Sequence, residues 1–355
     1  MNGRKVYGEI TALGYDCALF LDETSQHYLA DMHITDGAVI VSAHETALLT
    51  DSRYMEIALT NELSKDVEPY KFEKPLFEYI ADYLRNVHAK KVCVDPALIT
   101  VKQLETLKEK CEGVEFGFAS DICLKYRRVK TPEEIENIKK AQEITDATFT
   151  HILGFINSDR TELEVAAEME YFMRCMGASG LAFDTIAVSG KKSSMPHGIP
   201  GDVKLTMNSF FTMDFGAAYN DYCSDMTRTV VLGKASDEMK TVYNTVRTAQ
   251  AEAMKFIKAG VRAADADKVA RDIITEAGYG EFFGHSLGHS LGLEIHERPS
   301  VSSRSEDVLV PGNIVTVEPG IYLPGKFGVR IENMVLVTET GCENLTNSSR
   351  ELIEL

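Results

Sequence analysis

Five residues towards the C-terminal end of the chain are of the types that bind divalent metal ions: Asp214, Asp225, His289, Glu318 and Glu332. They lie in phrases typical of short strands or tight turns: FFTMDFGAAYNDYCSDMTRTVVL, FFGHSLGHSLGLEIHERP, NIVTVEPGIYL and FGVRIENMVLV. Four carboxylates gathered in a buried place would repel one another strongly without cations. Two divalent ions would balance these charges and could hold a hydroxide nucleophile between them. We therefore expect a dinuclear metal site.

The two aspartates flank a segment with the turn-prone pair Asn220 and Asp221 at its middle. A hairpin with its turn at this pair would bring Asp214 and Asp225 together on adjacent strands. A solvated hairpin face is the alternative explanation for acidic residues in strands. The apolar residues around both aspartates favour burial instead, and buried paired acids require a cation.

The phrase GHSLGHSLGLEIHE contains three of the nine histidines of the chain, His285, His289 and His296. Their spacing would place them on one face of a helix, but the interspersed glycines favour a non-helical segment in which backbones approach closely. Filling of the core is the alternative, and so dense a group of histidines favours an active site. His197, in the loop-like phrase SSMPHGIP, carries no such signal by itself.

Glu318 and Glu332 lie within apolar strands, where a single glutamate is usually paired with a cation. Arg330 is the obvious local partner for one of them. A ligand set rich in oxygen with one imidazole suits hard or borderline ions such as Mn²⁺, Co²⁺, Fe²⁺ or Zn²⁺. It argues against a structural zinc held by thiolates.

Two regions must position these residues. Residues 1–125 alternate strand-like and helix-like segments, which indicates a small α/β domain. The boundary lies near KYRRVKTPEEI, where Thr131, Pro132 and Glu134 have the pattern of a helix start with a capping box. After it, the order helix, helix, strands occurs twice, and each half supplies a pair of the carboxylates. We expect a duplicated α+β unit with the site at the seam between its halves.

The composition limits the class of protein. With 355 residues, 44% of them apolar and 26% charged, the chain suits a globular protein of two domains. Its formal net charge of −17 disfavours nucleic acid and anionic membranes as partners. It has no signal-peptide pattern and no apolar run of bilayer length. Seven cysteines without a CxxC pair are typical of reduced thiols, so we expect a cytoplasmic protein.

Taken in order, the phrases resemble those of the pita-bread metallopeptidases, which include Xaa-Pro aminopeptidase, Xaa-Pro dipeptidase and, more distantly, methionine aminopeptidase. The resemblance covers residues 128–355, and the part that contains LLTDSRY resembles the smaller domain of the proline-specific branch and of creatinase. It implies an α+β fold. A creatinase-type N-terminal α/β domain, residues 1–125, would precede a pita-bread catalytic domain, residues 128–355, whose halves are related by a pseudo-twofold axis.

The resemblance also implies a role for each metal ligand. Asp214 would bind one ion, and Asp225 and Glu332 would bridge both. His289 and Glu318 would bind the second ion. Mn²⁺ is the expected metal, with Co²⁺, Zn²⁺ or Fe²⁺ as alternatives.

The remaining roles concern the substrate. Glu318 would act as a general acid and base that carries a proton to the leaving nitrogen, and His197 or His296 would stabilise the oxyanion. His197, His285, His296 and Arg330 would bind the substrate.

The implied activity is hydrolysis of the bond between an N-terminal residue and a following proline, with a hydroxide that bridges the metals as the nucleophile. Short peptides with proline in the second position would be the substrates, and a homodimer is expected. The chain departs from the family pattern in two places. Ser290 occupies a position where many members have glycine, and Ser300 occupies one where some dipeptidases have an arginine that meets the dipeptide carboxylate. Arg298 is a candidate substitute for that arginine.

Three alternatives are each disfavoured by one feature of the chain. A methionine aminopeptidase usually lacks the N-terminal domain. A non-enzymatic peptide-binding protein on the same scaffold typically loses metal ligands, and a creatinase-like hydrolase works without metals, so neither would be expected to keep all five.

Overall fold

The computed structural model describes residues 2–60 and 67–355. The chain forms two compact units, Met1–Tyr126 and Arg127–Leu355. Both combine helices with sheets, as the sequence predicts. Among the residues described, no helix has the length and apolar character needed to cross a bilayer.

The first unit is built on a six-stranded mixed sheet in the order β4-β3-β2-β1-β5-β6. The strands are β1 (Cys17–Phe20), β2 (Gly37–Val41), β3 (Thr46–Thr50), β4 (Val67–Lys71), β5 (Lys91–Val94) and β6 (Glu115–Phe118). The helices are α1 (Asn2–Ala12), α2 (Glu23–Ala30), α3 (Met55–Thr60), α4 (Leu76–Asn86), α5 (Val101–Lys110) and α6 (Ile122–Arg127). Every residue of β1, β2 and β3 is buried, which explains why these strands are nearly continuous apolar runs.

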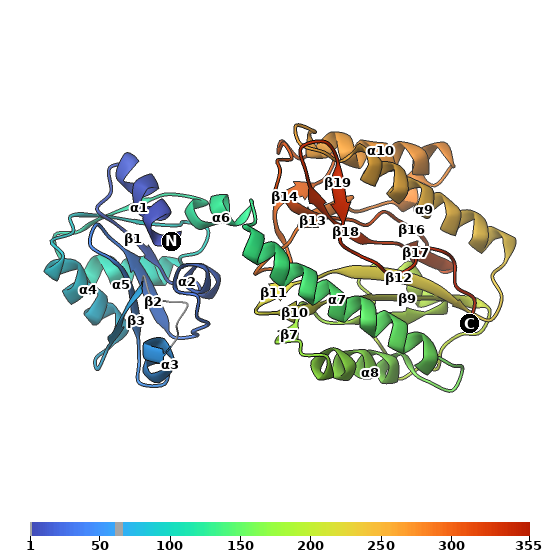
Figure 1. The fold of residues 1–355 in the computed structure, drawn as a ribbon, viewed down its shortest axis with the longest axis horizontal. Helices are drawn as coiled ribbons and strands as arrows, with labels where there is room; N and C mark the ends of the chain where they lie inside the picture. Colours follow the sequence, from blue (N-terminus) through green and yellow to red (C-terminus); the bar gives the residue numbers. More distant parts are fainter. Residues whose placement is uncertain (1, 61–66) are drawn as a thin grey trace. The chain divides into compact units, whose positions relative to one another are not determined.

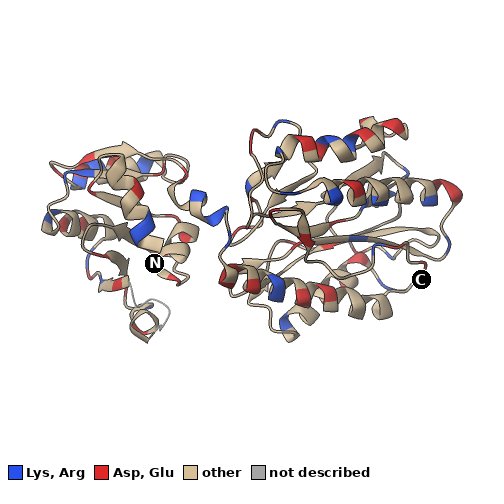
Figure 2. Ribbon diagram, turned by 45° about the horizontal axis from the view of Figure 1, so that its top comes forward, with Lys and Arg blue, Asp and Glu red and all other residues tan. Residues whose placement is uncertain are grey.

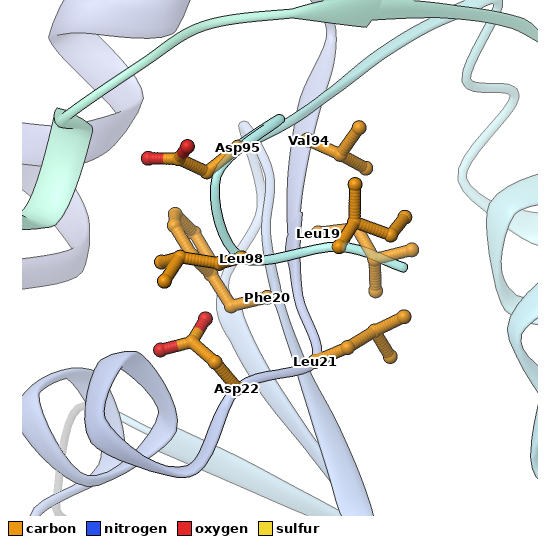
Figure 3. Close-up of a pocket in the computed structure, with 8 residues that line it drawn as sticks. Leu19, Phe20, Leu21, Asp22, Val94, Asp95 and Leu98 are labelled. Carbon is orange, nitrogen blue, oxygen red and sulfur yellow. The ribbon is translucent and has the colours of Figure 1, made fainter. Parts of the chain in front are cut away.

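A hollow lies at the carboxyl ends of β1 and β5, which pair in parallel. Figure 3 shows Asp22 and Asp95 on one side of it, with Phe20 and Leu98 between them. The two carboxylates hold local turns. Asp22 accepts from the backbone N–H of Ser25 at the start of α2, and Asp95 accepts from two backbone N–H groups.

The second unit repeats the order helix, helix, strands, as the sequence predicts. Its first half contains α7 (Pro132–Phe155), α8 (Glu162–Cys175), β7 (Gly180–Leu181), β8 (Ile186–Ser189), β9 (Ser209–Phe215), β10 (Ala217–Tyr219), β11 (Tyr222–Cys223) and β12 (Met226–Leu232). Its second half contains α9 (Asp237–Phe256), α10 (Ala263–Glu276), β13 (Gly288–Ser290), β14 (Glu297–Val301), β15 (Ile314–Val317), β16 (Gly320–Leu323), β17 (Phe327–Arg330), β18 (Asn333–Val337) and β19 (Cys342–Asn344). Capping boxes begin α7 at Thr131 and α8 at Thr161.

Each pair of helices covers its own core. In Figure 1, α9 and α10 lie along one side of the second unit and α7 and α8 along the other, with strands between them. The first core joins α7 and α8 to β8, β9 and β12, and the second joins α9 and α10 to β15, β16 and β17. Acidic and basic residues are interspersed along the helices (Figure 2), as expected for solvated faces.

The antiparallel strands β9 and β12 are shared by the two cores. Phe211 and Phe215 pack in the first core, whereas Phe210 packs in the second. Because side chains alternate along a strand, Asp214 lies on the same face as Phe210, towards the second half. The register pairs Asp214 with Thr227. The fold therefore places a carboxylate at the seam between the halves.

Candidate metal centre

The hairpin expected between the two aspartates is confirmed. The short strands β10 and β11 connect β9 to β12 through a turn at Asn220 and Asp221, whose φ angles are 46° and 64°. Two-residue hairpin turns require this left-handed conformation. Burial and, next, the carboxylate of Asp214 raise the pKa of Asp225 well above its ordinary value. Since the register pairs Asp214 with Thr227, two residues after Asp225, the two acids are close neighbours.

His289 lies in β13 at a place where two backbones pack closely. A Cβ at Gly288 would lie 2.1 Å from the carbonyl oxygen of Thr316, so only glycine fits there. Nδ1 of His289 lies 3.1 Å from the carbonyl oxygen of Ser290. A carbonyl only accepts, and we infer that Nδ1 carries the proton. Nε2 then keeps a lone pair for a metal ion.

Glu318 and Glu332 follow β15 and β17 and approach this imidazole. His289 Nε2 lies 3.4 Å from Glu318 Oε1 and 3.4 Å from Asp225 Oδ2. Ligand atoms of Asp225, His289 and Glu332 all lie within 4.8 Å of one another. Thr227 fixes Glu332, because its carbonyl accepts from the Glu332 backbone N–H at 3.1 Å and its hydroxyl donates to Glu332 Oε2 at 2.8 Å.

The electrostatics of this group indicate missing positive charge. Burial raises the pKa of Asp225, Glu318 and Glu332, and the Asp225 carboxylate adds to the effect on Glu332. Among the described residues, Asp214 Oδ1, Asp225 Oδ1 and Glu332 Oε1 are buried and have no hydrogen-bond partner. Buried carboxylate oxygens without a partner fit divalent cations, for which oxygen is a preferred ligand. The residues present therefore suit a metal centre.

Arg330 is buried beside the acids and uses its donors on protein atoms. Its Nη2 lies 2.5 Å from Asp214 Oδ2 and its Nη1 lies 2.7 Å from the hydroxyl of Tyr322. Its Nε donates to the hydroxyl of Thr227 at 2.9 Å. This guanidinium orients Asp214.

His285 lies next to the same tyrosine. Its Nδ1 lies 2.8 Å from the carbonyl oxygen of Ser286, and its Nε2 lies 2.8 Å from the hydroxyl of Tyr322. Nδ1 therefore donates, and the tyrosine donates to Nε2. Burial and, next, Arg330 lower the pKa of His285 to about 4, which keeps the ring neutral. The resemblance suggested that Arg330 and His285 would contact the substrate, but in the structure both make hydrogen bonds to other residues of the protein.

The other two histidines are exposed. The ring of His296 lies 4.4 Å from that of His289, centroid to centroid. Partial burial of its ring and, next, His289 lower the pKa of His296. His197 follows the 3₁₀ turn Gly190–Ser194 and lies near enough to both His285 and His296 to lower their pKa values. The structure therefore brings the four histidines of the sequence prediction into one region.

Comparison with known proteins identifies the family. Residues 136–339 match the metallopeptidase family M24, and residues 4–129 match the creatinase/prolidase N-terminal domain. The chain belongs to metallopeptidase family M24. This confirms the resemblance found in the sequence, the pita-bread fold class and the assignment as a metallo-exopeptidase. The M24 family implies divalent metal ions, typically two.

Several relatives of this M24 chain are similar over nearly its whole length. An Xaa-Pro dipeptidase of Pyrococcus furiosus is 41% identical over 317 residues, which is 89% of each chain. The solved structure of an Xaa-Pro dipeptidase from Bacillus anthracis has a TM-score of 0.96 and 41% identity, covering 100% of this chain and 99% of that one. An X-Pro aminopeptidase from Thermotoga maritima has a TM-score of 0.93 and 36% identity, with both chains covered completely.

The sequence interpretation missed three residues of the M24 site: Thr227, Thr316 and Tyr322. The hydroxyl of Thr316 accepts from the backbone N–H of His289 at 3.1 Å and donates to Glu318 at 3.2 Å, so it joins two candidate ligands. One signal was available. Residues two apart along an extended chain share a face, and Thr316 is two before Glu318, as Thr227 is two after Asp225.

Proposed function

We propose that this metallopeptidase hydrolyses the peptide bond between an N-terminal residue and a following proline. The observation that carries the proposal is the buried group of Asp225, His289 and Glu332, with carboxylate oxygens that lack partners among the described residues. Relatives named for action on Xaa-Pro peptides match this chain over most of its length, which supports the proline preference.

We propose that five residues hold two divalent ions: Asp214, Asp225, His289, Glu318 and Glu332. The mixed oxygen and imidazole set suits Mn²⁺ well, with Co²⁺, Zn²⁺ and Fe²⁺ as alternatives. When bound, such ions lower the pKa of water so that hydroxide is available near neutral pH.

The residues of the chain would then handle the proton and the carbonyl. Glu318, whose pKa is raised by burial, is suited to take a proton and pass it to the leaving proline nitrogen. His296 and His197 are exposed, and an imidazole N–H from either would donate to the carbonyl oxygen as it gains charge. The acidic group would also attract the free α-amine of the substrate.

The region around Ser300 bears on peptide length. The register pairs Ser300 with His289, so their side chains lie on the same face of the sheet. Serine offers no cation for the carboxylate of a dipeptide at this position. The guanidinium of Arg298 lies 3.8 Å from the carboxylate of Asp307 and so already has an acidic partner. We propose that the site accepts peptides that continue beyond proline as well as Xaa-Pro dipeptides.

A substrate panel with added Mn²⁺ tests this function. It compares Xaa-Pro dipeptides, longer peptides with proline in the second position, and Met-Ala peptides. Cleavage of both proline classes is expected. Cleavage of dipeptides alone would overturn the proposal on length, and a preference for Met-Ala would overturn the proline specificity. Ser300→Arg should shift the ratio of kcat/KM towards dipeptides, because the added cation would meet their carboxylate.

Three broader proposals accompany the activity. We propose that domains 1–125 and 128–355 are the functional divisions of the chain, a view supported by the matched ranges 4–129 and 136–339. The resemblance to the proline-specific peptidases supports a homodimer. Six cysteines are free thiols, namely Cys17, Cys93, Cys111, Cys175, Cys223 and Cys342, and this supports work in a reducing compartment such as the cytoplasm.

A further inference from the structure

A buried group of charged residues lies behind the strand that carries His289. Lys130 Nζ donates to Ser290 Oγ and to Glu297 Oε2, both at 3.1 Å. The side chains of Lys130 and Glu297 are each only 1% exposed. Arg127 donates to the other oxygen of Glu297. The proposed reaction uses none of these four residues. Burying ionic groups is costly unless they are paired, so this buried group requires an explanation.

Two cations keep the carboxylate of this group ionised, although burial lowers the pKa of Lys130 itself. Burial alone would raise the pKa of Glu297, but Lys130 and Arg127 hold it below its ordinary value. The carboxylate is therefore ionised at neutral pH and keeps a fixed acceptor in front of Lys130. The backbone makes room for it, because a Cβ at Gly292 would lie 2.8 Å from Glu297 Oε1. Glycine at this position gives the carboxylate its space.

Ser290 connects this group to the metal centre. Its hydroxyl accepts from Lys130, and its carbonyl oxygen accepts from Nδ1 of His289. Ser290 pairs with Glu297 in β14 and with Val315 in β15, and the register shifts between His289 and Ser290. The bulge re-aims the chain at this point. The direction of the Ser290 carbonyl, and with it the orientation of the His289 ring, therefore depends on what holds Ser290.

We propose that Lys130, Ser290 and Glu297 form a positioning unit that orients His289 for metal binding. The inference rests on the proposed role of His289 as a ligand. It also gives a role to the buried hydroxyl of Ser290. With glycine at this position, Lys130 would lose one of its two acceptors and the bulge would lose its side-chain anchor.

Metal binding by the full-length chain tests the proposal. Calorimetric titration of chelator-treated protein with Mn²⁺ would compare the wild type with Ser290→Ala and Lys130→Met. Each variant should bind one of the two ions about tenfold more weakly, as is typical when a group that orients a metal ligand is removed. The reduced kcat should recover as Mn²⁺ is raised, while KM at saturating Mn²⁺ stays at the wild-type value.

Thr148→Ala is the matched control. Thr148 is fully buried, and its hydroxyl donates to a backbone carbonyl within α7. This variant should lower the melting temperature of the metal-free protein without changing its affinity for Mn²⁺. If Ser290 served stability alone, Ser290→Ala would likewise lower the melting temperature and leave the affinity for Mn²⁺ unchanged. The visible spectrum of the Co²⁺-loaded protein gives a second readout, because a reoriented imidazole changes the ligand field.

The outcomes separate this inference from the proposed function. If the wild type binds two ions and Ser290→Ala binds both with unchanged affinity, the positioning role is overturned. If the wild type binds no Mn²⁺ at all, the metal centre itself is wrong. Should Lys130→Met fail to fold, Ser290→Ala carries the test alone, because it removes one hydroxyl and leaves the pair of Lys130 and Glu297 in place.

Discussion

Replacing Glu332 with glutamine should stabilise the metal-free protein, and in the presence of metal it should abolish peptidase activity. Glu332 is 1% exposed, one of its oxygens accepts from Thr227, and the other is buried without a partner among the described residues. Burial and, next, the Asp225 carboxylate raise its pKa well above the ordinary value. A group whose pKa is higher in the folded state costs stability as pH rises through that pKa. Glutamine carries no charge and avoids this cost.

The magnitude follows from the unpaired oxygen. A buried polar atom without a partner costs about 1–3 kcal/mol, and the amide N–H₂ of glutamine can donate to the Asp225 carboxylate. The free energy of unfolding should therefore rise by about 1–3 kcal/mol at about pH 8, or roughly 2–12 °C in melting temperature. Below about pH 4, under the ordinary pKa of an unfolded glutamate, the gain should vanish, because the side chain is then neutral in both the folded and the unfolded state.

Glu162→Gln is the matched control for this substitution. Glu162 is equally buried, but it accepts from the backbone N–H groups of Ser189 and Gly201 and from Lys192. Glutamine at this position would lose the ion pair with Lys192, and its N–H₂ group would point at hydrogen-bond donors instead of acceptors. The same change should therefore destabilise the protein by about 3–5 kcal/mol. Thermal unfolding with chelator at both pH values provides the comparison. If Glu332→Gln is destabilising at the higher pH, as Glu162→Gln is, the idea of repelling carboxylates is wrong.

Three further predictions concern the same site. Treatment with EDTA should abolish peptidase activity and Mn²⁺ or Co²⁺ should restore it, whereas activity that survives thorough chelation would rule out a metal mechanism. His197→Ala should lower kcat while metal content, measured by elemental analysis, stays at the wild-type level; loss of metal would contradict its proposed role at the substrate. Arg330→Met should destabilise the metal-free protein by about 3–5 kcal/mol, because it leaves Asp214 without its cation, and added Mn²⁺ should recover part of that loss in a thermal melt.

The features that the sequence predicted well are those with local causes. The start of α7 follows from a capping box within a single turn of helix. The hairpin between Asp214 and Asp225 follows from the left-handed preference of Asn220 and Asp221. Close packing at Gly288 was also correctly expected, but a Cβ at Gly284 would meet nothing within 4 Å, so this second glycine has no such role.

The features that the sequence did not predict depend on register between distant segments. Threonine is common in strands, and nothing near Thr227 shows that its carbonyl and hydroxyl both meet Glu332, which is 105 residues away. Tyr322 joins Arg330 to His285 only because β16 and β17 pair as a hairpin beside the histidine loop. Charge can be recognised in a sequence because burying it demands compensation. Burying a hydroxyl costs much less, so a sequence gives little indication of its hydrogen-bond partners, which are known only once the register of the strands is known.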